Sequence, residues 1–255
     1  MNGLYIGSMG MMNYMQHVNV HANNISNAQT TGFKADKMTS TMFDTHETYR
    51  EQNGRKEAIG TIDYTVVPAA THVNLTRGTF QVTNSATDFY LDNGGADRTS
   101  FFVVSKNGET YMTSDGQFTV NEDGYLRTSS GAYVMDVNNA RIQIPEGAQL
   151  SVQQDGTLYN GDTMIAKLQT KSVANADNAR LLKHEGKMFT LEGTNIADLP
   201  NGNAAVSNYM LEGSNVDMSK EMVDVMTNQK MVQASQRIMT SFDKVYEKEA
   251  NEILK

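Results

Sequence analysis

Two segments with a heptad repeat stand at opposite ends of the chain, and neither has a similar segment beside it in the sequence. The first runs from about residue 4 to residue 28, and the second from about residue 214 to the end. Between them, apolar residues recur at every second position, as in β-strands. Because a helix with one apolar stripe must bury it, we predict that the two ends pair with each other or with copies in neighbouring subunits.

The stripe of the first segment alternates steps of four and three residues. Its apolar positions include Leu4, Met11, Met15, Val18 and Ile25. The run HANNISNAQTTGFKAD at residues 21–36 then ends the helix, because Asn and Gly tolerate the left-handed conformation that closes one. We predict that Asn23, Asn24 and Asn27 end the helix and hydrogen-bond exposed backbone groups.

The second segment begins with a capping pattern in which Ser214 is the predicted N-cap and Asp217 follows three residues later. Its apolar column recurs every seven residues at Met218, Val225, Val232, Met239 and Tyr246. The companion column is more polar and comprises Met222, Gln229, Gln236, Asp243 and Ala250. A long helix with so polar a seam is poorly buried alone, so this pattern indicates assembly rather than catalysis.

The middle of the chain has the pattern of a β-meander or small sandwich. Short apolar runs alternate with turn pairs about eight residues apart at Asn107-Gly108, Asp115-Gly116, Asp123-Gly124 and Ser130-Gly131. The expected strands there include FFVVS, TYMTS, QFTVN, YLRTS, AYVMD and RIQIP. The fold class is therefore α+β, with a central, mostly antiparallel β domain between the paired helices. The predicted divisions are residues 1–33, an irregular linker or extended arm at 34–70, a β domain at 71–205, and residues 206–255.

Composition excludes several classes of function. The net charge is −8 and no basic cluster occurs, which argues against nucleic-acid binding. The absence of Cys excludes disulfides, thiol nucleophiles and thiolate metal sites. The N-terminus lacks the features of a Sec signal peptide, and no apolar run approaches the roughly 20 residues of a membrane span. We expect no membrane insertion.

The residues that suggest site chemistry have simpler explanations. His17 and His21 lie four apart on one helix face, but Val18 stands where a zinc metalloprotease has Glu. The acidic runs at residues 92–97 and 121–124 lack the EF-hand spacing and are typical of tight turns. No G-x-S-x-G, P-loop or G-x-G-x-x-G motif occurs. We therefore predict structural histidines, and no catalytic, cofactor or metal site.

The two ends of the chain resemble the two signatures of the flagellar rod and hook proteins, which are the axial proteins of the bacterial basal body. The first signature is an apolar heptad leading into an Asn-rich run and Thr-Gly-aromatic-Lys, and the second is Glu-x-Ser-Asn-Val-Asp before a long helix. The matching N-terminal positions are Asn23, Asn24, Ile25, Ser26, Asn27, Thr31, Gly32, Phe33 and Lys34. The matching C-terminal positions are Glu212, Ser214, Asn215, Val216 and Asp217.

The resemblance implies a structural subunit of the extracytoplasmic basal body, not an enzyme. Its paired terminal helices would line the inner tube of a helical homo-polymer, with the β domain outside. The implied partners are copies of itself, neighbouring rod and hook proteins, and the flagellar type III export apparatus, which exports such subunits unfolded without a cleaved Sec signal. No cofactor is implied.

Several alternatives stay open. The short middle region is similar to that of the proximal or distal rod proteins, while a hook or rod–hook junction member is the alternative within the family. A cell-wall-associated enzyme or glycan-binding module would instead need a concave polar site within residues 71–205. One stretch departs from the family pattern. Before the position of the paired Phe101 and Phe102, the family usually runs from an apolar strand straight into Gly-Asp-Gly, whereas this chain has the longer and more polar run DFYLDNGGADRTSFF.

Overall fold

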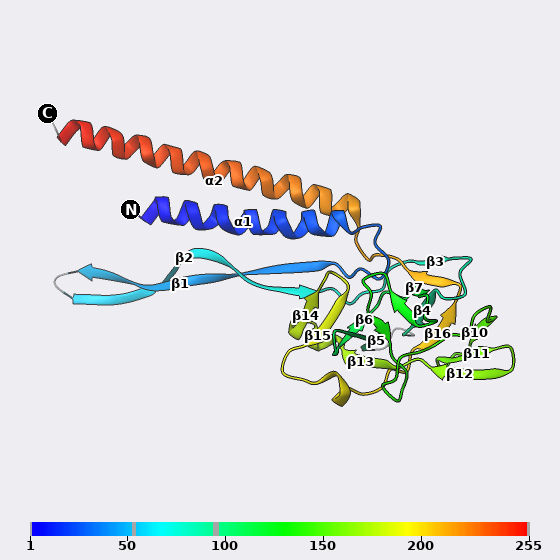
Figure 1. Ribbon diagram of the computed structural model, residues 1–255. Coiled ribbons are helices and arrows are strands. Elements are labelled where there is room, and N and C mark those ends of the chain that lie inside the picture. The colour runs from blue at the N-terminus through cyan, green and yellow to red at the C-terminus, as the bar shows by residue number, and fades with distance from the viewer. Residues whose placement is uncertain (1, 53–54, 94–96, 254–255) are drawn as a thin grey trace. The chain divides into compact units, whose positions relative to one another are not determined.

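The computed structural model describes residues 2–52, 55–93 and 97–253 of the chain (Figure 1). It divides into two compact units, which we call the helical unit and the β unit. The helical unit comprises Met1–Ile25, Asp36–Thr71 and Asp217–Lys255. The β unit comprises Ser26–Ala35 and His72–Val216. Terminal helices and a mostly antiparallel β domain confirm the predicted α+β class.

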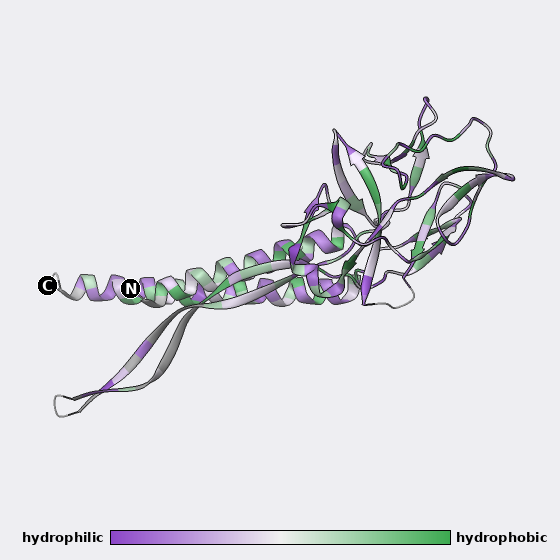
Figure 2. Ribbon diagram, turned by 90° about the horizontal axis from the view of Figure 1, so that it is seen from below, coloured by the Kyte–Doolittle hydropathy of each residue, from purple (hydrophilic) through white to green (hydrophobic). Residues whose placement is uncertain are grey.

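Helices α1 (Asn2–Ser26) and α2 (Met218–Ile253) lie side by side in the helical unit (Figures 1 and 2). The Nδ1 atom of His21 lies 2.6 Å from Oε2 of Glu221. Near the other end of α1, a Cβ on Gly7 would lie 3.0 Å from Cγ of Met239. The partner's number on α2 rises as that on α1 falls, so the two helices run antiparallel.

Strands β1 (Asp36–Gln52) and β2 (Arg55–Val73) pair as a long two-stranded sheet and run in opposite directions in Figure 1. For residues 34–70 we expected an irregular linker or extended arm, and the structure has strands β1 and β2 in this region. The segment is rich in Thr and other strand-favouring residues. It lacks the period-two apolar pattern by which a half-buried strand is recognised.

Ser40 of β1 hydrogen-bonds this two-stranded sheet to the middle of α1. The Oγ atom of Ser40 donates to Oδ1 of Asn13 at 2.9 Å, and the same Oγ lies 2.9 Å from Nε2 of His17. Asn13 is buried although it is polar, and this contact gives its side chain a partner. The helical unit therefore consists of two helices with a two-stranded sheet hydrogen-bonded to α1.

The β unit holds the remaining strands and two short 3-10 helices, η1 (Asn175–Arg180) and η2 (Ile196–Asp198). Its main sheet has eight strands in the order β14-β15-β6-β5-β9-β8-β7, with β13 also paired to β5. Three smaller sheets pair β10-β11-β12, β16-β4 and β17-β3. The strands are β3 (Phe80–Val82), β4 (Phe89–Asp92), β5 (Arg98–Lys106), β6 (Glu109–Thr113), β7 (Phe118–Val120), β8 (Leu126–Thr128), β9 (Tyr133–Val134), β10 (Leu150–Val152), β11 (Thr157–Asn160), β12 (Thr163–Lys167), β13 (Thr170–Ala174), β14 (Leu181–His184), β15 (Met188–Leu191), β16 (Ala205–Asn208) and β17 (Met210–Glu212).

Strand β5 is buried on both faces and separates two apolar cores. Phe102 and Val104 belong to one cluster of buried residues, and Phe101 and Val103 belong to the other. Successive side chains of a strand point to opposite faces, which is why a continuous apolar run suits this position. The run FFVVS thus forms the centre of the β unit.

The strand predictions for the middle of the chain need one correction. Residues 141–145, expected as a strand from the run RIQIP, form only isolated bridges, from Arg141 to Met135 and from Gln143 to Tyr125. Part of the polar run at residues 92–100 lies outside the described residues, and within the described part Oδ1 of Asn93 accepts a hydrogen bond from the backbone N–H of Ser100.

The start of α2 corrects a second prediction. The carboxylate of Asp217 accepts hydrogen bonds from the backbone N–H groups of Ser219 and Lys220, so Asp217 is the N-cap. Ser214 accepts instead from the backbone N–H of Val216. An Asp before a helix accepts hydrogen bonds from the free N–H groups of the first turn, and its negative charge interacts favourably with the positive end of the helix dipole.

Neither α1 nor α2, nor any other helix of the described residues, has the length and apolar composition of a membrane span.

Candidate functional site

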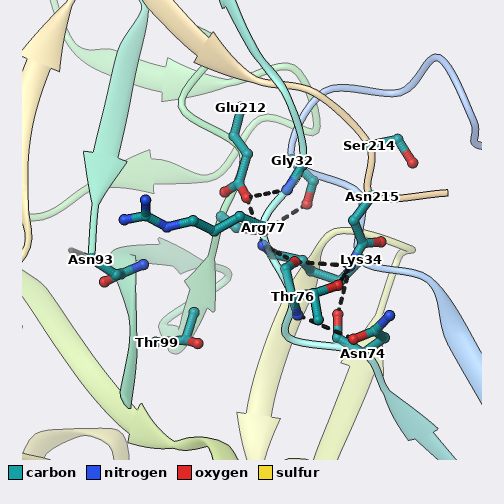
Figure 3. A network of polar contacts seen from close by, with 12 residues as sticks. Gly32, Lys34, Asn74, Thr76, Arg77, Asn93, Thr99, Glu212, Ser214 and Asn215 are labelled. Atoms are coloured by element: carbon teal, nitrogen blue, oxygen red, sulfur yellow. Dashed lines mark hydrogen bonds and ion pairs between the residues drawn. The ribbon is translucent and has the colours of Figure 1, made fainter. Parts of the chain in front are cut away.

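The signature residues from the two ends of the sequence meet in one buried polar network of the β unit (Figure 3). The ammonium of Lys34 lies 2.7 Å from Oε1 of Glu212, 178 positions away in the chain. The side chain of Lys34 is only 2% exposed and that of Glu212 only 9%. Two charges so buried are stabilised only when they are paired and fully hydrogen-bonded.

Backbone groups supply the further partners of this ion pair. Lys34 also donates to the carbonyl oxygen of Thr76 at 3.1 Å, and Glu212 Oε1 accepts from the N–H of Gly78 at 3.0 Å. The carbonyl of Glu212 accepts from the N–H of Gly32 at 2.8 Å. A Cβ on Gly78 would lie 1.9 Å from the carbonyl oxygen of Gly213, so only glycine permits this approach of three segments.

The amide of Asn215 joins the same three segments. Its Oδ1 accepts from the backbone N–H of Ala35 at 2.7 Å. Its Nδ2 donates to the carbonyl oxygens of Asn74 and Thr76, each at 2.9 Å. The side chain thus accepts and donates at the same time, which an Asp carboxylate cannot do because it has no donor.

A lysine from strand β14 covers the aromatic residue of the first signature. The Nζ atom of Lys183 lies 4.2 Å from the ring centroid of Phe33 and donates to the carbonyl oxygen of Lys34 at 2.8 Å. Phe33 itself is fully buried. A cation over an aromatic face is attracted by the ring quadrupole, so this contact fixes the first signature against the sheet.

The Thr-Gly pair of the first signature docks on the turn that follows β6. Thr31 donates to Oδ1 of the buried Asp115 at 3.0 Å, and Lys187 donates to Oδ2 of the same carboxylate at 2.7 Å. Gly32 has φ of +65°, and a Cβ there would lie 2.4 Å from Cα of Asp115. Glycine is therefore required both by the backbone conformation and by the close approach.

The remaining N-terminal signature residues lie in or beside the end of α1. Within the helical unit, the fully buried Asn24 donates to the carbonyl of Asp36 and accepts from its N–H, both at 2.9 Å. Asn24 also donates to Glu221 at 3.2 Å. In the turn after α1, Thr30 donates through its Oγ1 to Oδ1 of Asn27 and through its N–H to the Asn27 carbonyl.

The predicted seam of the helices is only partly buried. Four of its residues are exposed, namely Leu4, Met15, Met218 and Tyr246. Six are half-buried, namely Met11, Val18, Ile25, Val225, Val232 and Met239. Many other large apolar side chains on the two helices are exposed as well, and Figure 2 shows apolar residues along both.

The companion column on α2 differs from the predicted one. The positions that alternate with Val225, Val232 and Met239 are Glu221, Asn228 and Ser235. Met222, Gln229 and Gln236, which the sequence analysis placed in that column, are all exposed. Small residues allow helices to approach closely, and a Cβ on Gly10 would lie 3.8 Å from the Oγ of the buried Ser235. A search for apolar residues alone overlooks such a column.

The two histidines of α1 contact two different elements of the helical unit. The rings of His17 and His21 are stacked with centroids 6.2 Å apart, and each ring contacts a different element, His17 through Ser40 and His21 through Glu221. Burial, and then the charge of His21, lowers the pKa of His17. Among the described residues, no group of three or more His, Asp or Glu side chains could hold a metal ion.

Sequence reasoning missed several residues of the network. Lys183, Lys187 and Gly78 lie far from both signatures in the sequence, and no local motif marks them. The turn pair Asp115-Gly116 marks Asp115 only as a turn residue. A weak signal exists only at Asn74, whose Oδ1 accepts from the N–H two residues later in a turn. The network holds segments from both ends of the sequence together within the β unit, and its polar groups hydrogen-bond one another.

Family models match three parts of the chain. The model described as flagella basal body rod protein matches residues 4–34. The flagellar hook protein FlgE/F/G D1 domain matches residues 98–160, and the flagellar basal body rod FlgEFG protein C-terminal region matches residues 207–253. The first and last of these matches include Lys34, Glu212 and Asn215, the signature residues of the buried network.

Three relatives are similar over nearly the whole chain. The flagellar basal-body rod protein FlgF of Caulobacter vibrioides is 29% identical over 241 residues, which is 93% of this chain and 92% of the relative. The flagellar basal-body rod protein FlgG of Bacillus subtilis is 27% identical over 98% of each chain. The flagellar hook-basal body complex protein FlhP of the same organism is 26% identical over 90% of this chain and 91% of the relative.

Proposed function

Since this chain belongs to the family of flagellar rod and hook proteins, we propose that it is a structural subunit of the basal-body rod and polymerises through its terminal helices. In this proposal the subunit has no catalytic activity and transmits torque as part of a hollow axial tube. Its partners are other copies, the neighbouring rod and hook proteins, and the type III apparatus that exports it without a cleaved Sec signal.

The observation that carries the proposal is a contrast between buried polar groups and exposed apolar ones. Signature residues 178 positions apart form a buried ion pair within the chain. Both helices meanwhile expose large apolar side chains, among them Tyr5, Met12, Val223 and Ile238. Helix α1 carries no Asp, Glu, Lys or Arg at all, which is unusual for a helix that is to remain in water. Such surfaces are typical of interaction sites.

Antibody labelling of isolated hook–basal bodies, viewed by electron microscopy, is the first test. We expect label on the rod, at a position that separates a proximal from a distal member. Label on the hook or at its junction with the rod would indicate a hook or rod–hook junction protein of the same family. Reproducible absence from intact basal bodies would overturn the rod proposal and favour a wall-associated protein.

A charge placed on the helix seam tests how the subunit polymerises. We expect Met15→Glu and Val232→Glu to abolish flagella, because an ionised side chain in an apolar contact is strongly destabilising. Met164→Glu on β12 is the matched control, since it makes the same change at an exposed methionine outside the helices. Circular dichroism of each variant checks that the β unit is folded. Functional flagella in both seam variants would show that the seam assignment is wrong.

A further inference from the structure

Methionine supplies all the sulfur of this protein, since the chain has seventeen Met and no Cys. Nine of these methionines belong to α1 and α2. Six of the nine are exposed, and they are Met12, Met15, Met218, Met222, Met226 and Met231. We call these six the helical methionines. In the core of the β unit, by contrast, Met112 and Met188 are at most 3% exposed.

The helical methionines lie in groups on the helix surfaces. Met218, Met222 and Met226 are spaced by four residues, and Met12 and Met15 by three, so the members of each group share one face of their helix. The group on α2 also lies beside the exposed Val223. A thioether is apolar and flexible, which suits an adaptable packing surface.

We propose that the helical methionines are an oxidation site that controls assembly, such that a subunit oxidised at these positions no longer joins the polymer. This inference rests on the proposed rod function, because it assigns a chemical sensitivity to the surface that polymerises. The oxidant is of the peroxide class. The sulfur of an exposed thioether attacks one peroxide oxygen, the O–O bond breaks, a sulfoxide S–O bond forms, and the second oxygen leaves as water.

Oxidation changes the polarity of the side chain, and packing between helices depends on an apolar side chain. A sulfoxide is polar and chiral, and it disrupts apolar contacts that methionine makes. Burying its oxygen between two helices without a hydrogen-bond donor costs free energy. Exposure decides which methionines react, so the free subunit is vulnerable on its helices and protected in its β core. A subunit already packed in a polymer would be protected on its helices as well.

The first part of the test compares the free subunit with isolated hook–basal bodies. Both are treated with hydrogen peroxide, and sulfoxide at each methionine is quantified by peptide mass spectrometry. Met164 is the internal reference, because at 57% exposure it matches Met226 at 54% but lies on β12 in the β unit. In the free subunit we expect the helical methionines to react about as fast as Met164. In basal bodies we expect them to react about tenfold more slowly relative to Met164, since reactivity follows exposure.

The second part measures assembly in cells that lack the natural copy and express the subunit on induction. Peroxide is present during induction, and flagella per cell are counted. Flagella are counted relative to the same strain without peroxide. On this measure we expect wild type and Met164→Leu to lose most flagella and a variant with Leu at all six helical methionines to lose few, because Leu has a similar volume and no sulfur. If the six-Leu variant assembles poorly without peroxide, variants limited to the α1 pair or the α2 four replace it.

The outcomes separate the inference from the function on which it rests. Equal peroxide sensitivity of the wild type and the six-Leu variant would overturn the inference, and so would undiminished reactivity of the helical methionines in basal bodies. Neither result would remove the protein from the rod. Absence of the protein from basal bodies would instead overturn the rod function itself.

Discussion

The buried polar network in which the two signatures meet, which we call the junction, differs from the surface of the two helices in where its side chains find their contacts. At the junction, a buried lysine, a buried glutamate and an asparagine amide find their partners within the same chain. On the helices, large apolar side chains such as Met226 and Ile238 remain exposed. The first arrangement is complete in a single subunit, whereas the second leaves apolar side chains exposed, and the proposed polymer contacts would cover them.

This difference assigns separate roles to the two parts of each signature. The Thr-Gly-Phe-Lys and Glu-x-Ser-Asn residues belong to the β unit and hold segments from both ends of the sequence together. The Asn-Asn residues lie in the last turn of α1 and Asp217 is the N-cap of α2, and all three belong to the helical unit. A substitution in the β unit should therefore lower the stability of the free subunit. A substitution on the exposed helix surface should spare that stability and affect assembly.

Lys34→Met should have the largest effect on the free subunit. It leaves the carboxylate of Glu212 buried without its counter-ion, and breaking a buried pair in this way costs roughly 3–5 kcal/mol. The free energy of unfolding is measured by urea denaturation, followed by circular dichroism. The double variant Lys34→Met/Glu212→Leu should recover part of the loss, because no buried charge is then left unpaired.

The matched control for this prediction is Lys106→Met. Lys106 pairs with Glu185, whose side chain is 53% exposed, and an exposed pair contributes only about 0–1 kcal/mol. If both substitutions reduced stability by the same amount, the junction would not hold the β unit together, and the comparison drawn above would fail.

Gly32→Ala should have the next largest effect. An alanine at φ of +65° is strained by about 1–2 kcal/mol, and its Cβ meets the backbone of Asp115, which adds roughly 1–3 kcal/mol of overpacking. Gly131→Ala separates these two causes, because Gly131 has φ of +83° with nothing within 4 Å of the added Cβ. Urea denaturation of both variants should show the larger loss for Gly32→Ala. Equal losses would mean that the loop does not dock closely on Asp115.

The sequence predicts the helical half of this fold better than the details of its contacts. Apolar periodicity is a local signal, and of the predicted column Val225, Val232 and Met239 are half-buried, with Met239 lying beside Gly7 of α1. The same signal overlooks Asn228 and Ser235, since a small polar residue can lie in a close helix contact without being apolar.

The junction is predictable in its members but not in their partners. The resemblance singles out Lys34, Glu212 and Asn215. Their carbonyl partners come from the segment between β2 and β3, the Lys183 ammonium comes from β14, and no local pattern sets the position of either. The N-cap error has a similar cause. Ser214 and Asp217 are both good capping residues, and the choice between them depends on where Asn215 is held.

Asn24→Ala tests the helical unit at a fully buried asparagine. The substitution leaves the N–H and carbonyl of Asp36 without these partners, and an unsatisfied buried group costs about 1–3 kcal/mol. Hydrogen exchange of α1 amides, read by mass spectrometry, should accelerate accordingly. Asn23→Ala is the neighbouring control at an exposed position, where we expect a change within about 0.5 kcal/mol. Faster exchange in both variants would indicate general fraying of α1.

The smallest expected effect is a pH dependence at His17. Burial and the charge of His21 lower the pKa of His17 below its ordinary value of 6.5, so the folded helical unit favours the neutral ring. As the pH falls below 6.5, the unfolded chain binds a proton that the folded form resists. The stability contributed by neutral His17 is therefore present above the unfolded value and is lost as the pH falls through the lowered folded value.

Nuclear magnetic resonance titration of the histidine rings would measure this pKa directly. Hydrogen exchange of α1 at pH 7 and pH 5, after correction for intrinsic rates, would show whether the helical unit loosens. His17→Gln should remove the pH dependence while keeping a polar side chain near Ser40, whose Oγ contacts the ring. His184→Gln in the β unit should leave it unchanged. If wild type and His17→Gln lost protection equally between these pH values, another group would be responsible. The pH response would then not distinguish the helical unit from the β unit.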